Sequence, residues 1–166
     1  EVWGRVGECD LMLMLAGKGV GLGVGAWRPV WYGRSRSVSP RGEGEAFGAK
    51  LRLRMISALE QSGSAWLPVV HADTSVEAAL AGQAPMTGAC RLLLDASGES
   101  MLDALHALDG PVTIALGPEG GLTDGERAQF IRGGWRLVSL GANVLRFETA
   151  GIAALAIVRA HTGGQR

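Results

Sequence analysis

The stretch Pro111–Glu126 reads "PVTIALGPEGGLTDGE", and it predicts how this chain folds. An apolar run ends at Leu116, a loop with three glycines and a proline follows, and Thr123 and Glu126 have the T-x-x-E spacing of a helix N-terminus. A strand without alternating polar residues is typical of a sheet that is covered on both faces. The stretch therefore predicts a buried strand, a tight loop and a helix, in that order.

The same alternation continues on both sides of this stretch. We predict strands over 26–32, 66–70, 90–96, 111–117 and 135–141, and helices over 11–22, 45–62, 74–82, 101–108, 123–134 and 145–161. Pro29 places its strand near an edge or an end, and Thr74 with Glu77 predicts a second capping box. Alternating strands and helices predict an α/β domain with a mostly parallel sheet.

Composition narrows the class of protein. The 166 residues are 47% apolar and 19% charged, which is typical of one globular domain. Glycine occurs 26 times, about double its average usage, and indicates many tight turns. We expect no membrane span, because no apolar run reaches about 18 residues, and a reducing cytoplasm is the default compartment.

Charge and metal-binding residues give two further expectations. The net charge is zero, but residues 28–54 are rich in arginine, which indicates either an anionic partner or an ordinary solvated face. We expect no metal, because the cysteines and histidines have no ligand spacing: Cys9, Cys90, His71, His106 and His161.

Ligands of parallel sheets bind beyond the carboxyl ends of the strands, where we expect loops after Leu94, Leu116 and Leu140. The glycine loop matches neither the dinucleotide nor the P-loop fingerprint and contains no lysine. A tight turn and a ligand-binding loop remain equally open for it. Arg146 and Glu148, near the start of the last helix, are either ordinary surface charges or a guanidinium and a carboxylate that face a ligand.

Taken together, "LGPEGG" at 116–121 and "LGANVLRFETA" at 140–150 resemble the signature pair of the RsmE-like ribosomal RNA methyltransferases, which belong to the SPOUT class. The segments "KGVGLGV" at 18–24 and "EQSG" at 60–63 resemble further family motifs, so the resemblance covers about residues 10–162. It implies an α/β fold with a C-terminal trefoil knot, an exception to the rule against knots. It also implies a homodimer that binds S-adenosylmethionine and methylates N3 of a uridine in small-subunit (16S) ribosomal RNA.

The resemblance further implies that residues 1–166 form the methyltransferase domain, without the PUA-like RNA-binding domain that family members carry at the N-terminus. Arg146 and Glu148 are the expected catalytic residues, Arg146 as a stabiliser of negative charge on uracil and Glu148 (or Glu119) as proton acceptor or orienting group. Expected RNA contacts are Lys18, Arg34 and Arg36. Expected cofactor contacts are Leu94, Leu116, Gly117, Glu119, Gly120, Gly121, Leu140, Gly141, Asn143, Val144 and Leu145.

This chain departs from the family pattern at four positions. Gly21 replaces a usual glutamate, Ser64 replaces a usual arginine, and Ala142–Asn143 replaces a usual Pro-Arg pair. These departures affect the expected RNA side more than the cofactor side. Two other hypotheses therefore stay open: a knotted, cofactor-binding dimerisation module with reduced or lost catalysis, and an unrelated α/β enzyme with a coincidental glycine loop.

Overall fold

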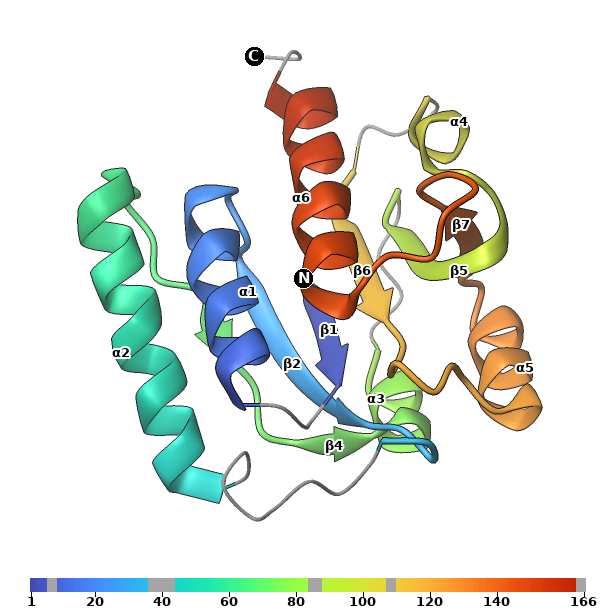
Figure 1. Ribbon diagram of the computed structural model, residues 1–166, viewed down its shortest axis with the longest axis horizontal. Coiled ribbons are helices and arrows are strands. Elements are labelled where there is room, and N and C mark those ends of the chain that lie inside the picture. The colour runs from blue at the N-terminus through green and yellow to red at the C-terminus, as the bar shows by residue number, and fades with distance from the viewer. Residues whose placement is uncertain (6–8, 36–43, 84–87, 107–109, 164–166) are drawn as a thin grey trace.

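A parallel β-sheet passes through the centre of the molecule (Figure 1). The computed structural model describes residues 1–5, 9–35, 44–83, 88–106 and 110–163. Among these residues seven strands form the sheet, and every pairing between them is parallel. The strand order is β3 (Val69–Val70), β2 (Ala26–Trp31), β1 (Val2–Arg5), β6 (Val112–Leu116), β5 (Cys90–Ser100) and β7 (Arg136–Ser139), and β4 (Thr74–Ser75) also pairs with β2. The prediction of a mostly parallel α/β domain is confirmed.

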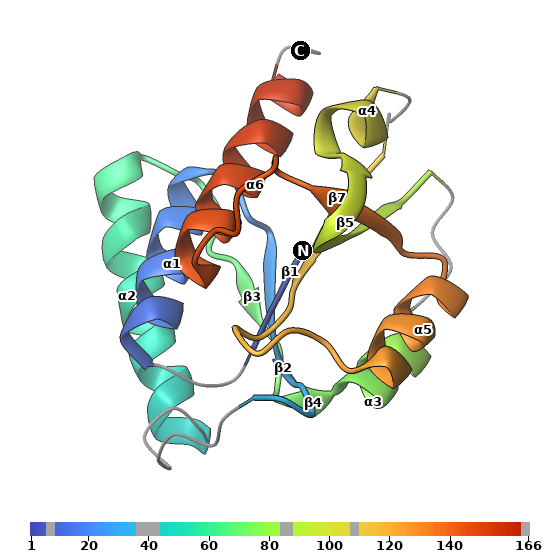
Figure 2. The same cartoon turned by 45° about the vertical axis from the view of Figure 1, so that its right-hand side comes forward.

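Helices cover both faces of the sheet (Figure 2). One face carries α1 (Cys9–Gly21), α2 (Gly44–Ser62) and α6 (Phe147–Gly163), with the short α4 (Met101–Leu105) beside α6. The other face carries α3 (Val76–Ala81) and α5 (Asp124–Arg132). None of the described helices combines the length and apolar character needed to cross a bilayer.

Each face has its own core. Under α1, α2 and α6 the core is mainly aliphatic, with the fully buried Leu15, Leu51 and Met55 at its centre. Under α3 and α5 it is aromatic: the ring of Trp135 lies 4.7 Å from that of Trp3 and 5.0 Å from that of Phe130. Such ring pairs bury much apolar surface and favour a defined geometry, so they hold α3 and α5 against this face of the sheet.

Strand β1 was not predicted, although it lies in the middle of the sheet between β2 and β6. Its four residues, "VWGR", are too few to show a period. Gly4 is needed there because a Cβ atom would lie 2.7 Å from the ring atom Cζ2 of Trp27. The strand therefore depends on its neighbours and not on a local sequence pattern.

Pro29 does not mark an edge, because β2 has partners on both sides. The carbonyls of Gly25 and Trp27 accept hydrogen bonds from the chain around β3. The backbone N–H and C=O groups of the odd-numbered residues of β2 therefore point toward β3 and β4. Pro29 lies between the residues that pair with β3 and those that pair with β4. Its missing N–H therefore falls where the neighbouring strand is interrupted, and no ladder hydrogen bond is lost.

The two expected capping boxes had different outcomes. Thr123 caps α5 and exchanges hydrogen bonds with Glu126, as predicted. Thr74 belongs to β4 instead, and Ser75 caps α3 by accepting a hydrogen bond from the N–H of Ala78 at 3.1 Å. Thr74 and Ser75 are neighbours in the sequence, and both residue types can cap a helix. The T-x-x-E spacing alone therefore predicted the wrong residue as the cap.

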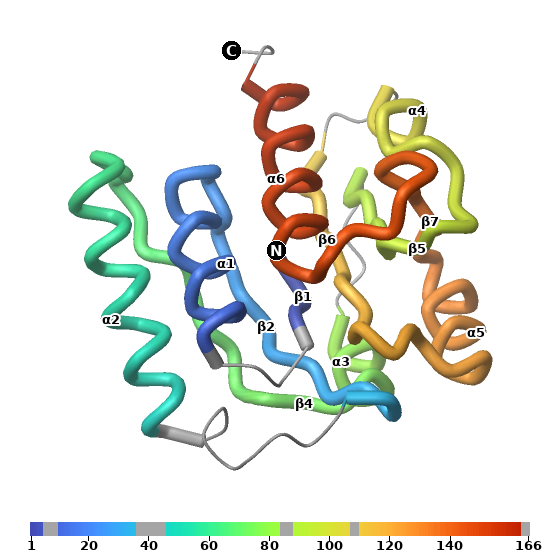
Figure 3. The backbone as a smooth tube through the Cα atoms, in the orientation of Figure 1, coloured from blue at the N-terminus to red at the C-terminus, as the bar shows by residue number. Residues whose placement is uncertain are grey.

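Strands β5 and β7 have an unusual relation. Leu94 and Glu99 both pair with Val138, with a register shift between them. A residue in a strand can pair with one residue on each side of that strand. Leu94 and Glu99 therefore lie on opposite sides of Val138, and the chain crosses β7 between residues 94 and 99. Figure 3 shows the tube of β5 curving past β7 before it reaches α4.

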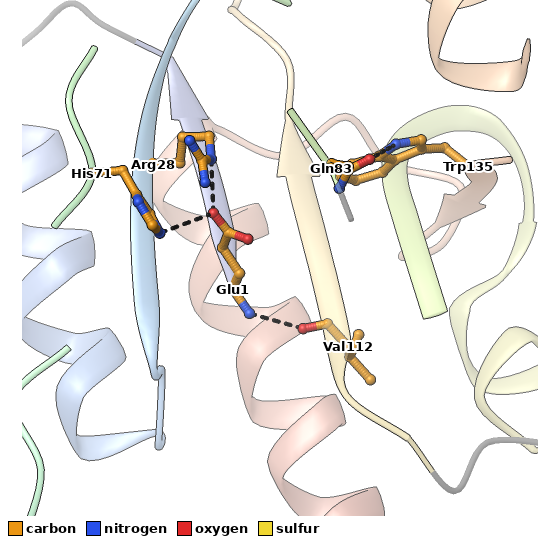
Figure 4. A network of polar contacts seen from close by, with 6 residues as sticks. All are labelled: Glu1, Arg28, His71, Gln83, Val112 and Trp135. Carbon is orange, nitrogen blue, oxygen red and sulfur yellow. Dashed lines mark hydrogen bonds and ion pairs between the residues drawn. The ribbon is translucent and has the colours of Figure 1, made fainter. Parts of the chain in front are cut away.

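Polar residues occupy the sheet near the starts of β1 and β2 (Figure 4). A carboxylate oxygen of Glu1 accepts a hydrogen bond from Nε of Arg28 at 2.8 Å and lies 3.6 Å from Nε2 of His71. Nearby, the indole N–H of Trp135 donates to Gln83 at 3.2 Å. These contacts lie at the amino ends of the strands, opposite the edge where a ligand is expected.

Candidate functional site

A cleft of about 340 Å³ lies beside the middle of β5, where β6 and β7 end and α6 begins. This volume is within the range of pockets that hold small organic ligands. Of the residues expected to contact a cofactor, the structure brings together all except Gly120. They are Leu94, Leu116, Gly117, Glu119, Gly121, Leu140, Gly141, Asn143, Val144 and Leu145.

The glycine loop is both a tight turn and a wall of this cleft. The N–H of Gly121 donates to the carbonyl of Pro118 at 2.8 Å, and Gly121 has a φ of 71°. A residue with a side chain is strained at this φ, so glycine is needed for the turn. Glu119 and Gly121 line the cleft, whereas Gly120 between them does not.

The loop after β7 supplies an apolar wall. Leu140, Val144 and Leu145 line the cleft, and Val144 is 90% exposed. An apolar side chain so open to solvent at the mouth of a cleft is free to cover a bound molecule. Gly141 turns this loop with a φ of 127°.

Asp95 and Ala96 also line the cleft, and neither was among the expected cofactor contacts. The loop expected after Leu94 is absent, because β5 continues through both residues to Ser100. Asp95 accepts hydrogen bonds from the N–H and the hydroxyl of Ser97 at 2.8 and 2.6 Å, and its other oxygen lies 3.2 Å from Nε of Arg127 on α5. Burial alone would raise the pKa of the Asp95 carboxyl, but these partners outweigh it and hold the pKa below its ordinary value. The available signal was its place directly after the apolar residues Leu92–Leu94.

Further unpredicted residues complete the cleft. Pro118 and Leu122 belong to the glycine loop, Val138 and Ser139 to β7, and Phe147 and Ala150 to the first turns of α6. Both charged residues among the described residues of the lining, Asp95 and Glu119, are acids. The cleft therefore combines apolar walls with two carboxylates, of which Asp95 is paired with Arg127 outside the lining. This suits a ligand with an apolar part and a positive charge.

Glu126 ties the glycine loop to the chain after β2. One of its oxygens accepts from the N–H of Gly33 at 2.7 Å, and the other accepts from the N–H and hydroxyl of Thr123, both at 2.8 Å. Burial would raise the pKa of Glu126, but these hydrogen bonds and the nearby guanidinium of Arg34 hold it below its ordinary value. Nη1 of Arg34 in turn donates to the carbonyl of Gly120 at 3.2 Å.

The expected catalytic residues lie beside the cleft. Arg146 is exposed, between Leu145 and Phe147 of the lining. Glu148 is half-buried in the first turn of α6, and its Oε2 atom has no hydrogen-bond partner among the described residues. No ion pair joins Arg146 to Glu148 in this part of the chain, as expected for residues two apart on a helix start.

The expected RNA contacts do not gather at one place. Arg34 is exposed next to the glycine loop. Lys18 is exposed in the last turn of α1, close to the residues that lead into the start of β2, and thus at the edge opposite the cleft. Arg36 lies outside the described residues. Within the described ranges, no group of three or more histidine, cysteine, aspartate or glutamate side chains is arranged to hold a metal ion.

Known proteins resemble this chain along most of its length. A 35% identical relative is the ribosomal RNA small subunit methyltransferase E of Treponema pallidum; the match covers 71% of this chain and 46% of the relative. The chain thus spans less than half the length of the curated relatives that it matches.

Solved structures agree with the fold. The ribosomal RNA small subunit methyltransferase E of Neisseria gonorrhoeae, solved with bound S-adenosyl methionine, superposes with a TM-score of 0.82 at 28% identity, over 96% of this chain and 65% of that one. A protein of Porphyromonas gingivalis superposes with a TM-score of 0.83 at 23% identity, which shows the fold alone. The family model described as "RNA methyltransferase domain" matches residues 8–159, and the chain therefore belongs to this family of RNA methyltransferase domains.

Proposed function

We propose that residues 1–166 form the methyltransferase domain of an enzyme that uses S-adenosylmethionine to methylate N3 of a uridine in small-subunit ribosomal RNA. The observation that carries the proposal is the cleft beside β5 and the ends of β6 and β7, with its glycine loop and acidic lining. The names of the relatives from Treponema pallidum and Neisseria gonorrhoeae support the same reaction class.

The donor set of the cleft fits this cofactor. S-adenosylmethionine has a flat apolar base, a ribose, and a sulfonium that gives it a net positive charge. Leu116, Leu140 and Val144 offer an apolar slot for the base, and the glycine loop offers backbone groups. Asp95 and Glu119 complement a cation, whereas no lysine or arginine among the described lining residues would hold a phosphate.

The cofactor, when bound, supplies a methyl group attached to a positively charged sulfur. In our proposal the two loops with the expected cofactor contacts hold it, and Asp95 is added to them. The chain mainly orients the two reactants, because methyl transfer of this kind requires in-line geometry.

Arg146 is the proposed catalytic residue. The N3 proton of uridine is weakly acidic, and its loss places negative charge on the uracil oxygens. The exposed guanidinium of Arg146, beside Leu145 and Phe147 at the cleft, is free to stabilise that charge. Glu148, with its unpartnered buried oxygen, and Glu119 are the candidates for accepting the proton.

The remaining features of the proposed enzyme concern its chain path and partners. The double pairing of Val138 supports a trefoil knot, because the chain crosses β7 between residues 94 and 99. Exposed small residues of α6, such as Ala156 and Ala160, support a homodimer through this helix. Arg34, Lys18 and Arg36 remain the proposed RNA contacts, and ribosomal RNA as substrate places the reaction in the cytoplasm.

Calorimetry tests the cofactor. We expect S-adenosylmethionine to bind at one site per chain and ATP, which shares the adenosine but carries phosphates, to bind at least about tenfold more weakly because of the acidic lining. Equal affinity for both, or no binding of S-adenosylmethionine, contradicts the proposal.

Methylation of unmodified small-subunit RNA by the full-length protein tests the reaction, with Arg146→Ala as the variant. We expect the variant to keep its cofactor affinity and to lose about 100-fold in methylation rate. If both stay normal, the role of Arg146 is wrong. Cofactor binding without any methylation by the wild-type protein would instead favour the knotted binding module.

A further inference from the structure

We propose that Arg34 is a positioning residue. It holds the glycine loop in the shape that lines the cleft, from the side of the loop that faces away from the cleft. Glu126 in turn holds the backbone next to Arg34. This inference rests on the proposed function, because it concerns the loop that would hold the cofactor. It gives Arg34 a role besides the RNA contact expected from its charge.

The contact joins two distant parts of the sheet. Arg34 follows β2, and the glycine loop follows β6, with β1 between these two strands. The chain after β2 nevertheless reaches the glycine loop, where Nη1 of Arg34 donates to the carbonyl of Gly120 at 3.2 Å. A charged donor on a backbone carbonyl makes a stronger hydrogen bond than a neutral one.

The glycine loop and the chain after β2 also pack against each other at Gly120. A Cβ atom at position 120 would lie 3.4 Å from Cβ of Arg34 and 3.5 Å from its carbonyl oxygen. These distances are ordinary van der Waals contacts. The glycine loop and the chain after β2 therefore pack directly against each other at Gly120 and Arg34.

The backbone of Arg34 is itself anchored on both sides. Before it, the N–H of Gly33 donates to Glu126 at 2.7 Å, and Glu126 also holds Thr123 at the start of α5. After it, the N–H of Ser35 donates to the carbonyl of Tyr32 at 2.9 Å, and the N–H of Tyr32 donates to the Ser35 hydroxyl at 3.2 Å. The guanidinium therefore projects from a fixed turn, as a positioning group requires.

Arg34 acts on the outer side of the loop. Gly120 does not line the cleft, whereas its neighbours Glu119 and Gly121 do. Arg34 is likewise absent from the described lining. Its effect on a ligand would therefore pass through the loop and not through direct contact.

The test compares Arg34→Ala and Arg34→Lys with wild type, and uses Arg132→Ala as control. Arg132 is exposed at the end of α5, and its substitution by alanine removes the same charge at a position outside the cleft lining. We expect Arg34→Ala to weaken S-adenosylmethionine binding about three- to tenfold by calorimetry, because one exposed charge-assisted hydrogen bond is lost. Arg34→Lys should restore most of the affinity, and Arg132→Ala should not change it.

A second measurement needs no cofactor. In ¹⁵N relaxation of the free protein, Arg34→Ala should lower the order parameters of the Gly120 and Gly121 amides, while those of α6 stay as in wild type. Unchanged order parameters overturn the inference, whether or not affinity falls, because a loss of affinity alone would indicate direct contact. Lower order parameters with unchanged cofactor affinity overturn it as well.

The relaxation result also separates the two proposals. If wild type binds no S-adenosylmethionine, the proposed function fails, yet the relaxation arm still shows whether Arg34 orders the loop. If wild type binds and Arg34→Met, which keeps the aliphatic stem, behaves like wild type in both measurements, only the role of the guanidinium fails.

Discussion

Strands β1 and β2 meet regularly and are locked by a large side chain, whereas β5 and β7 meet where the backbone of one crosses the other. In the first pair, four successive residues are in register and the ring of Trp27 lies over Gly4. In the second pair the register breaks between Leu94 and Glu99, and Gly98 lies against the backbone of Leu137 and Val138. The cleft is lined by the second region, from β5 to α6. Side-chain packing thus builds the scaffold, and close backbone contact builds the candidate site.

Gly98→Ala should have the largest effect. A Cβ atom at Gly98 would overlap the backbone atoms of Leu137 and Val138, which cannot move without breaking β7. We expect the free energy of unfolding to fall by at least about 4 kcal/mol, or folding to fail. Urea unfolding measures this.

Gly48→Ala is the matched control. Gly48 lies inside α2, and a Cβ atom there has nothing within 4 Å. Alanine should therefore stabilise the helix by about 0.5–1 kcal/mol. If both variants lose similar stability, the two regions do not differ in the way described.

Leu51→Ala tests the side-chain-packed region. Leu51, on α2, is fully buried in the aliphatic core, and its truncation leaves a cavity. We expect a loss of about 3 kcal/mol in the free energy of unfolding, with unchanged affinity for S-adenosylmethionine in the folded protein. Leu53→Ala, at a site 66% exposed on the same helix, should change stability by less than about 0.5 kcal/mol. A loss of cofactor affinity in Leu51→Ala would mean that the regions are coupled.

The sequence predicted local features of both regions better than their contacts. The T-x-x-E spacing gave the cap between Thr123 and Glu126, and the apolar run before Gly117 gave a buried strand with the cleft at its end. These predictions are confirmed because each feature is determined by residues that are close together in the sequence. The "VWGR" of β1 gave no signal, since a four-residue strand is set by the strands beside it.

Contacts between distant segments could not be derived. Nothing in the chain around Arg34 indicates that it reaches Gly120, 86 positions away, or that Arg127 reaches Asp95. Both contacts depend on the order of strands in the sheet. The charged residues were visible in the sequence, but the partners that decide their roles were not.

Lowering the pH should destabilise the cleft region through Asp95, and we expect this to be the smallest of the predicted effects on stability. The pKa of Asp95 is lowered on folding, so its ionised form is favoured in the folded protein. Its contribution to stability is therefore complete above the unfolded pKa of about 4, and it is lost as pH falls through the lower folded pKa. Wild type should thus exceed Asp95→Asn in stability at pH 7, and the difference should shrink as the pH falls below about 4.

Ser97→Ala sharpens this pH test, because it removes the hydroxyl that donates to Asp95 and accepts from Nη2 of Arg127, but keeps the N–H donor to Asp95. The pKa of Asp95 should then move up toward its ordinary value, and the acid loss should begin at higher pH than in wild type. Chemical unfolding at a series of pH values measures both variants. A difference between wild type and Asp95→Asn that is constant with pH would show that Asp95 acts through shape and not through charge.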